Sequence, residues 1–149
     1  MKAVIDTNIF ISGAISNKGK CALLLNYWKE GKFDLIISIA IINEIIEVLN
    51  RPEIKDRWDY TQIEINALIE SIYTLGVITP GLYEVKKSRD TKDNMFLACA
   101  LEGNADYLVT GDTHLSEIKY YQGIQIVNVT QFLKLLGIEE NKGGFFYGI

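Results

Sequence analysis

The chain is poor in the residues that bind zinc, because its 149 residues include one histidine and two cysteines. Cys21 and Cys99 show no CxxC spacing, and both lie in apolar stretches that are typical of helices. A zinc site takes about four such ligands, and a disulfide persists only in an oxidising compartment. We therefore interpret both cysteines as reduced structural thiols.

Long hydrophobic runs are also absent from the sequence. No apolar segment approaches the roughly 18 to 20 residues that a membrane-spanning helix needs. The first residues show no charged segment followed by a signal-like apolar block. The sequence also contains no internal repeat, low-complexity segment or interdomain linker. We expect a cytoplasmic protein with no membrane segment.

What the chain does contain is enough apolar material for a core. Its hydrophobic content is 48%, which excludes disorder and fits one globular domain over residues 1–149. Residues 138–149 form a C-terminal apolar tail, which we expect either to pack on its own domain or to cover another chain. The formal net charge of −4 weighs against broad electrostatic attraction to nucleic acid.

Short, continuously apolar segments alternate along the chain with segments of helical spacing. We predict buried strands at 2–6, 35–37, 77–78, 106–110 and 124–129, with a weaker candidate at 83–85. We predict helices at 8–13, 19–32, 38–50, 61–75, 93–102 and 130–136. Strands without polar alternation indicate a parallel sheet covered on both faces, and such sheets bind ligands beyond the carboxyl ends of their strands.

Four carboxylates occupy places where buried elements begin, end or meet a polar border. Asp6 closes the first strand, Glu44 lies within a helix, Asp93 opens another helix, and Asp112 follows the strand at 106–110. Bringing carboxylates together costs several kcal/mol unless cations or protons neutralise them. The joint pattern therefore predicts a cation site, and oxygen-only ligands favour hard ions such as Mg²⁺ or Mn²⁺ over zinc.

Each of these residues also has an ordinary structural explanation. Glu44 lies on the border of an apolar helical arc, whereas Glu47 points farther from it. Asp93 gains from the helix dipole in a first helical turn, and Asp90 is its rival as the helix cap. The two aspartates that follow strands are equally ordinary as caps or turn residues.

Together, the segments that carry these carboxylates resemble a PIN domain, a family of metal-dependent nucleases. The matching motifs are Val4-Ile5-Asp6-Thr7-Asn8, Asn43-Glu44, Asp93-Asn94-Met95-Phe96-Leu97-Ala98-Cys99-Ala100 and Leu108-Val109-Thr110-Gly111-Asp112. Their order and spacing cover nearly the whole chain. Within the family, the chain looks most like small single-domain toxins of bacterial or archaeal toxin–antitoxin pairs.

The resemblance implies an α/β fold, arranged as a three-layer α/β/α sandwich with a central, mainly parallel sheet. It implies RNA cleavage at a Mg²⁺ or Mn²⁺ site, with these catalytic and metal-binding residues: Asp6, Glu44, Asp93 and Asp112. It also names residues that would hold the ligands or their waters by hydrogen bonds: Thr7, Asn8 and Thr110. We choose Asp93 over Asp90 because the run at 96–100 follows Asp93 at the family spacing.

A basic loop at residues 86–92 runs directly into Asp93 and is the candidate RNA-binding segment. Its cations are Lys86, Lys87, Arg89 and Lys92. Such a cluster would guide a phosphate backbone toward the carboxylates, although a solvated loop explains it equally well. Without the four clustered carboxylates, the chain has 15 acidic residues against 15 basic ones.

The sequence thus predicts a divalent-metal-dependent endoribonuclease that acts as the toxin of a type II toxin–antitoxin module. We expect RNA as substrate, an antitoxin protein as partner, and a homodimer. Two alternatives stay open: a catalytically inactive PIN fold that binds RNA or serves as a scaffold, and a general RNA-processing nuclease without an antitoxin. A receiver-type phosphoryl-transfer domain fits less well, because no DxD follows the first strand.

Overall fold

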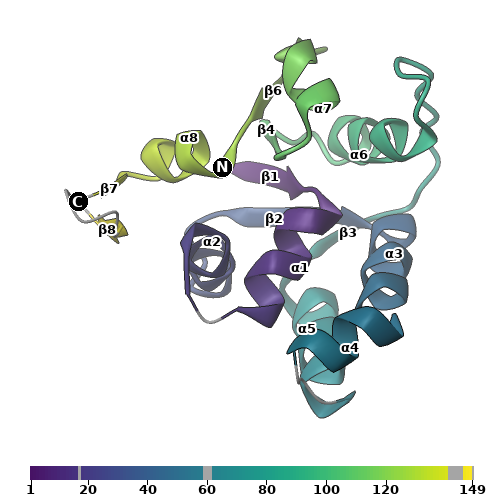
Figure 1. The fold of residues 1–149 in the computed structure, drawn as a ribbon. Coiled ribbons are helices and arrows are strands. Elements are labelled where there is room, and N and C mark those ends of the chain that lie inside the picture. The colour runs from purple at the N-terminus through teal and green to yellow at the C-terminus, as the bar shows by residue number, and fades with distance from the viewer. Residues whose placement is uncertain (17, 59–61, 141–145, 149) are drawn as a thin grey trace.

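The short apolar segments form a six-stranded sheet in the computed structural model, in the order β3-β2-β1-β4-β6-β5 (Figure 1). The structure describes the backbone of residues 1–16, 18–58, 62–140 and 146–148, and the side chains of these residues except 57–58, 138–140 and 146–148. The strands are β1 (Lys2–Ile5), β2 (Asp34–Ser38), β3 (Val77–Thr79), β4 (Tyr107–Val109), β5 (Tyr120–Tyr121) and β6 (Ile124–Val127).

Strand β1 lies at the centre of this sheet and is paired in parallel on both sides. Ala3 is in register with Leu35 of β2, and Ile5 is in register with Val109 of β4. The pairs β2–β3 and β4–β6 are also parallel, and only β5 runs antiparallel to its neighbour among the described strands of this sheet. The prediction of a mainly parallel sheet is confirmed. Burial is continuous through most of β1 and β2, whereas Val77 of β3 and Gln125 of β6 are exposed.

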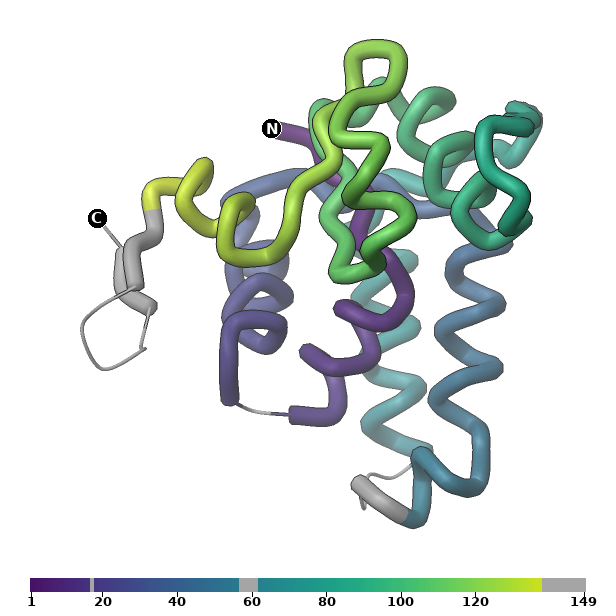
Figure 2. Tube along the Cα trace, turned by 45° about the horizontal axis from the view of Figure 1, so that its top comes forward, coloured from purple at the N-terminus to yellow at the C-terminus, as the bar shows by residue number. Residues whose placement is uncertain are grey.

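Helices cover both faces of the sheet. They are α1 (Thr7–Ile15), α2 (Lys20–Lys29), α3 (Ile39–Leu49), α4 (Pro52–Trp58), α5 (Gln62–Leu75), α6 (Thr91–Glu102), α7 (Thr113–Ile118) and α8 (Val129–Leu135). Helices α6 and α7 lie on one side, and α1, α2, α3 and α5 lie on the other (Figures 1 and 2). Right-handed crossovers require this separation. The chain moves across the sheet in one direction from β1 through β2 to β3, and in the opposite direction from β3 through β4 to β6. The three-layer α/β/α arrangement is confirmed.

The apolar faces predicted from helical spacing meet in one core. Helix α3 buries Ile41, Ile42 and Ile45 completely, and Trp28 of α2 packs against Phe10 with a ring centroid distance of 5.8 Å. Trp28 is therefore a core residue and has no exposed face for stacking a base. Among the described residues, no helix is both long and apolar enough to cross a membrane.

Helix α6 crosses the sheet so closely that its C-cap, Gly103, has no room for a side chain. A Cβ atom there would lie 2.2 Å from Ile36 Cγ2 and 3.2 Å from Thr79 Cγ2. Overpacking at such a contact costs about 1–3 kcal/mol, which restricts this position to glycine. The contact fixes the depth at which α6 lies over the sheet.

Several short elements differ from the sequence predictions. Helices α4 and α7, strand β5, and the hairpin of β7 (Ile138–Glu140) and β8 (Phe146–Gly148) were not predicted, because elements this short show no clear periodicity. The predicted strand at 83–85 is wrong: these residues lie outside the sheet, with Tyr83 and Glu84 exposed. The packing of the tail's side chains and the first residue of the helix predicted at 61–75 lie outside the described residues.

Candidate functional site

The order of the sheet reverses between β1 and β4, and two of the four predicted carboxylates follow these two strands. Asp6 comes directly after β1, and its backbone N–H donates to the carbonyl oxygen of Val109 at 3.0 Å. Thr110 and Asp112 follow β4. The carboxyl ends of strands at such a reversal form the crevice where open α/β sheets bind ligands.

Asp6 is buried at this crevice, with 4% of its surface exposed. One carboxylate oxygen caps α1 by accepting from the backbone N–H of Ile9 at 3.0 Å. The other oxygen accepts from the hydroxyl of Thr110 and, at 3.3 Å, from the N–H of Gly111. Burial raises the pKa of Asp6 above its ordinary value, although these hydrogen bonds act in the opposite direction.

Glu44 reaches the same crevice from α3. The hydroxyl of Thr7 donates to Glu44 Oε2 at 2.6 Å, and Lys92 Nζ lies 3.4 Å from Glu44 Oε1. Glu47, one turn along the helix, is exposed and pairs with Arg51 at 3.1 Å. The side chain of Glu44 therefore points into the crevice, which agrees with its place at the border of the apolar arc.

Asp93 lies in the first turn of α6, which begins at Thr91 and not at Asp93 as predicted. The helix begins earlier because Asp90 is the cap: its side chain accepts from the N–H of Lys92 at 2.9 Å. Asp93 is 5% exposed, and the hydroxyl of Ser88 donates to its Oδ2 at 3.2 Å. Burial raises the pKa of Asp93, and the negative charges of Asp112 and Asp90 raise it further.

Two residues that support Asp93 were missed by the sequence analysis. Asn94 holds the backbone of Ser88 from both sides, because its Oδ1 accepts from Ser88 N and its Nδ2 donates to Ser88 O, each at 2.8 Å. Ser88 in turn contacts Asp93. Asn94 stands beside Asp93 in the motif, which was a usable signal, whereas Ser88 was concealed among the charges of the basic loop.

Asp112 is the half-buried cap of α7, accepting from the backbone N–H of His114 at 2.7 Å and of Leu115 at 3.2 Å. Its own N–H donates to the hydroxyl of Thr110 at 3.0 Å, and that hydroxyl donates to Asp6. Thr110 thus connects the two strand-end aspartates through one hydrogen-bonded chain.

All four carboxylates line one cavity of about 110 Å³, which we call the acidic cavity. Its lining residues are Asp6, Thr7, Asn8, Glu44, Asp90, Lys92, Asp93, Phe96, Asp112 and Leu115. The structure therefore brings together the four predicted acidic residues with Thr7 and Asn8, while Thr110 contacts Asp6 from behind. Asp90, the rival of Asp93, lines the cavity as well.

The donor set fits a hard cation by its chemistry, because carboxylate oxygens dominate the polar lining. As the side chains stand, no three Asp, Glu, His or Cys residues among those described converge closely enough to hold a metal ion. Each carboxylate instead accepts hydrogen bonds or an ion pair from the protein. Ion binding would therefore exchange some of these contacts for bonds to the metal.

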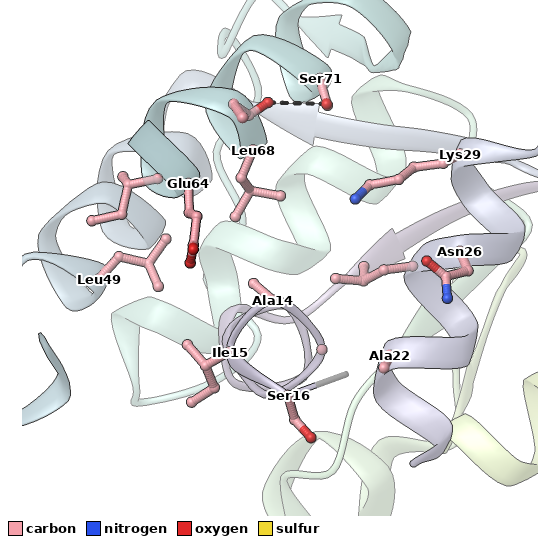
Figure 3. A pocket seen from close by; sticks show the side chains of 14 residues that line it. Ala14, Ile15, Ser16, Ala22, Asn26, Lys29, Leu49, Glu64, Leu68 and Ser71 are labelled. Atoms are coloured by element: carbon pink, nitrogen blue, oxygen red, sulfur yellow. Dashed lines mark hydrogen bonds between the residues drawn. The ribbon is translucent and has the colours of Figure 1, made fainter. Parts of the chain in front are cut away.

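A larger cavity of about 400 Å³ lies among α1, α2 and α5 (Figure 3). Figure 3 shows Ile15, Leu49 and Leu68 around it, with Lys29 and Glu64 among its polar side chains. It shares no lining residue with the acidic cavity, and Glu64 is the one carboxylate in its described lining. Of these two cavities, the smaller one therefore holds the cluster of carboxylates.

Comparison with known proteins gives three results. The sequence model of the family described as PIN domain matches residues 2–114. Uncharacterized protein MJ1680 of Methanocaldococcus jannaschii is 29% identical over 119 residues, which cover 80% of this chain and 76% of that protein. The crystal structure of VapBC2 from Rickettsia felis, bound to a DNA fragment from their promoter, matches at a TM-score of 0.52 and 15% identity, over 86% of this chain and 98% of that one. At that identity the likeness shows the fold.

The raised pKa values predict how the metal-free protein responds to pH and to loss of a carboxylate. A folded state that binds a carboxyl proton more tightly than the unfolded state loses stability as pH rises through the raised pKa. We therefore expect Asp93→Asn to leave the free energy of unfolding level or higher at neutral pH, and Asp6→Asn, which keeps a capping side chain, to do the same.

Urea melts in chelator across acidic to neutral pH measure this effect. Asp34→Asn, at an exposed position at the start of β2, is the control for losing a charge elsewhere. The wild-type protein should lose stability between the ordinary carboxyl pKa and neutrality more steeply than Asp93→Asn. A large loss of stability in both site variants at neutral pH would show that the two aspartates stabilise the fold, Asp6 as a helix cap and Asp93 in a first helical turn.

Proposed function

The chain belongs to the PIN domain family, and we propose that it is a divalent-metal-dependent endoribonuclease of the cytoplasm. The observation that carries this proposal is the acidic cavity, which Asp6, Glu44, Asp93 and Asp112 line from four separate parts of the fold. Carboxylates gathered at the reversal point of a parallel sheet, with raised pKa values at two of them, mark a site made for positive charge.

In this proposal the four carboxylates would hold Mg²⁺ or Mn²⁺, and the ion would lower the pKa of a water and place positive charge against the phosphodiester. No side-chain nucleophile is required. The Thr7 hydroxyl lines the cavity but donates to Glu44, so its role is to orient that carboxylate. Thr110 does the same for Asp6, and Asn8 presents an exposed amide that can bind water or phosphate.

We place the RNA backbone beside the cavity, on the basic loop. Lys86, Lys87 and Arg89 are exposed there and do not line the cavity. Ser88 lies between them and is anchored to both Asp93 and Asn94, which fixes the loop against the site. A phosphate held by these cations would therefore lie close to the carboxylates.

We propose further that the protein is the toxin of a type II module, with an antitoxin as partner and a second copy of the chain in a homodimer. The VapBC2 structure, which shares the fold, supports the antitoxin. Large apolar side chains exposed around β3, including Tyr73, Val77 and Leu82, support a covered surface. A neighbouring gene for a small DNA-binding protein would favour the toxin, whereas an isolated gene would favour general RNA processing.

The nuclease proposal predicts RNA cleavage that requires Mg²⁺ or Mn²⁺ and disappears in chelator. Zinc should not be the ion that gives the highest cleavage rate. Glu44→Gln should lower the cleavage rate on the order of hundredfold or more, because several kcal/mol of charge stabilisation depend on the bound ion. Glu47→Gln, on the exposed side of the same helix, is the matched control and should retain wild-type activity. Full activity after rigorous chelation, or equal rates in the two variants, would contradict the mechanism.

The basic loop predicts a separate effect on binding. Replacing Lys86, Lys87 and Arg89 by Gln should weaken RNA binding and reduce the slope of log affinity against log salt by about 0.7 for each phosphate that the loop no longer neutralises. Mn²⁺ binding should remain nearly unchanged. The control replaces Lys29, Lys32 and Lys134, which are exposed elsewhere. A salt slope that stays at the wild-type value in filter-binding titrations would show that the loop is an ordinary solvated surface with no role in RNA binding.

A further inference from the structure

Lys92 takes a different place from the other cations of the basic loop. It lines the acidic cavity, and its Nζ lies 3.4 Å from Glu44 Oε1. Lys86, Lys87 and Arg89 are absent from that lining. The backbone N–H of Lys92 is held by the side chain of Asp90 at 2.9 Å, so the lysine starts from a fixed point in the first turn of α6.

The negative charge of the acidic cavity gives the position of Lys92 a consequence for ion binding. Five carboxylates line the cavity, and among its described lining residues Lys92 is the single basic one. With Thr7 bound to Oε2 and Lys92 beside Oε1, both oxygens of Glu44 are engaged. Lys92 therefore supplies positive charge at the oxygen that a divalent ion would need.

The ammonium can also leave without disturbing the fold. The side chain of Lys92 is 65% exposed, whereas that of Glu44 is 16% exposed. A lysine stem is long and flexible and binds as a point charge, so moving it into solvent opens no cavity in the core. A divalent ion at Glu44 would repel the ammonium at this distance and favour its release.

We propose that Lys92 is a built-in competitor of the divalent ion: its ammonium neutralises Glu44 in the metal-free protein and withdraws when the ion binds. The inference rests on the proposed metal site and adds a residue that sets the affinity of that site. It also assigns Lys92 a role at the carboxylates, distinct from the contribution of the other three cations to RNA binding.

Calorimetric titration of the metal-free protein with Mn²⁺ tests this role without any measurement of activity. Lys92→Met should bind Mn²⁺ about fivefold more tightly than wild type, since an exposed ion pair of this kind is displaced at a cost of that order. Lys87→Met removes the same charge from the same loop outside the cavity and should stay within about twofold of wild type. Lys92→Arg, which keeps the cation, should retain the weaker wild-type affinity.

Thermal melts establish that each variant is folded before the titration. Equal Mn²⁺ affinity in Lys92→Met and Lys87→Met would overturn the competition, because only general electrostatics would then remain. Weaker binding in Lys92→Met would also overturn it, by making the lysine a support of the site. If wild type and every variant fail to bind Mn²⁺, the proposed metal site itself is wrong. The first two outcomes would contradict only the role of Lys92 and would leave the metal site standing.

Discussion

The cost of burying carboxylates in the acidic cavity, increased at Asp93 by the negative charges of Asp112 and Asp90, is the constraint on which the rest of the site depends. Asp6 and Asp93 are buried, and their surroundings raise the pKa of both. The protein offsets this unfavourable charge with local donors: a helix N-terminus at Asp6, the Ser88 hydroxyl at Asp93, and the ammonium of Lys92 at Glu44. In the proposed metal site, a divalent ion would replace some of these donors.

The fold creates this concentration of charge through its topology. Because β1 and β4 pair in parallel where the strand order reverses, the residues that follow them meet at one edge of the sheet. Helix α3 brings Glu44 from one layer, and α6, held close to the sheet at Gly103, brings Asp93 from the other. The same apolar packing that stabilises the domain therefore holds the carboxylates in place despite the cost of burying them.

Much of this arrangement was predictable from the sequence, because periodicity reports burial. The continuous strands identified the parallel sheet, and the apolar arc of α3 separated Glu44 from Glu47 correctly. Contacts made by loops were not predictable in the same way. The bond from Ser88 to Asp93 and the turn of Lys92 toward Glu44 depend on how the basic loop folds back over α6, which no periodic pattern encodes.

The central claim is that the four carboxylates act as one metal centre. Anomalous diffraction from crystals soaked in Mn²⁺ tests it most directly, because the manganese signal locates the ion independently of any assay. The account predicts an anomalous peak inside the acidic cavity, with oxygens of Asp6 and of at least one of the other three carboxylates bonded to the ion. A fully soaked crystal with no peak in that cavity, or with manganese bound elsewhere, would contradict the account.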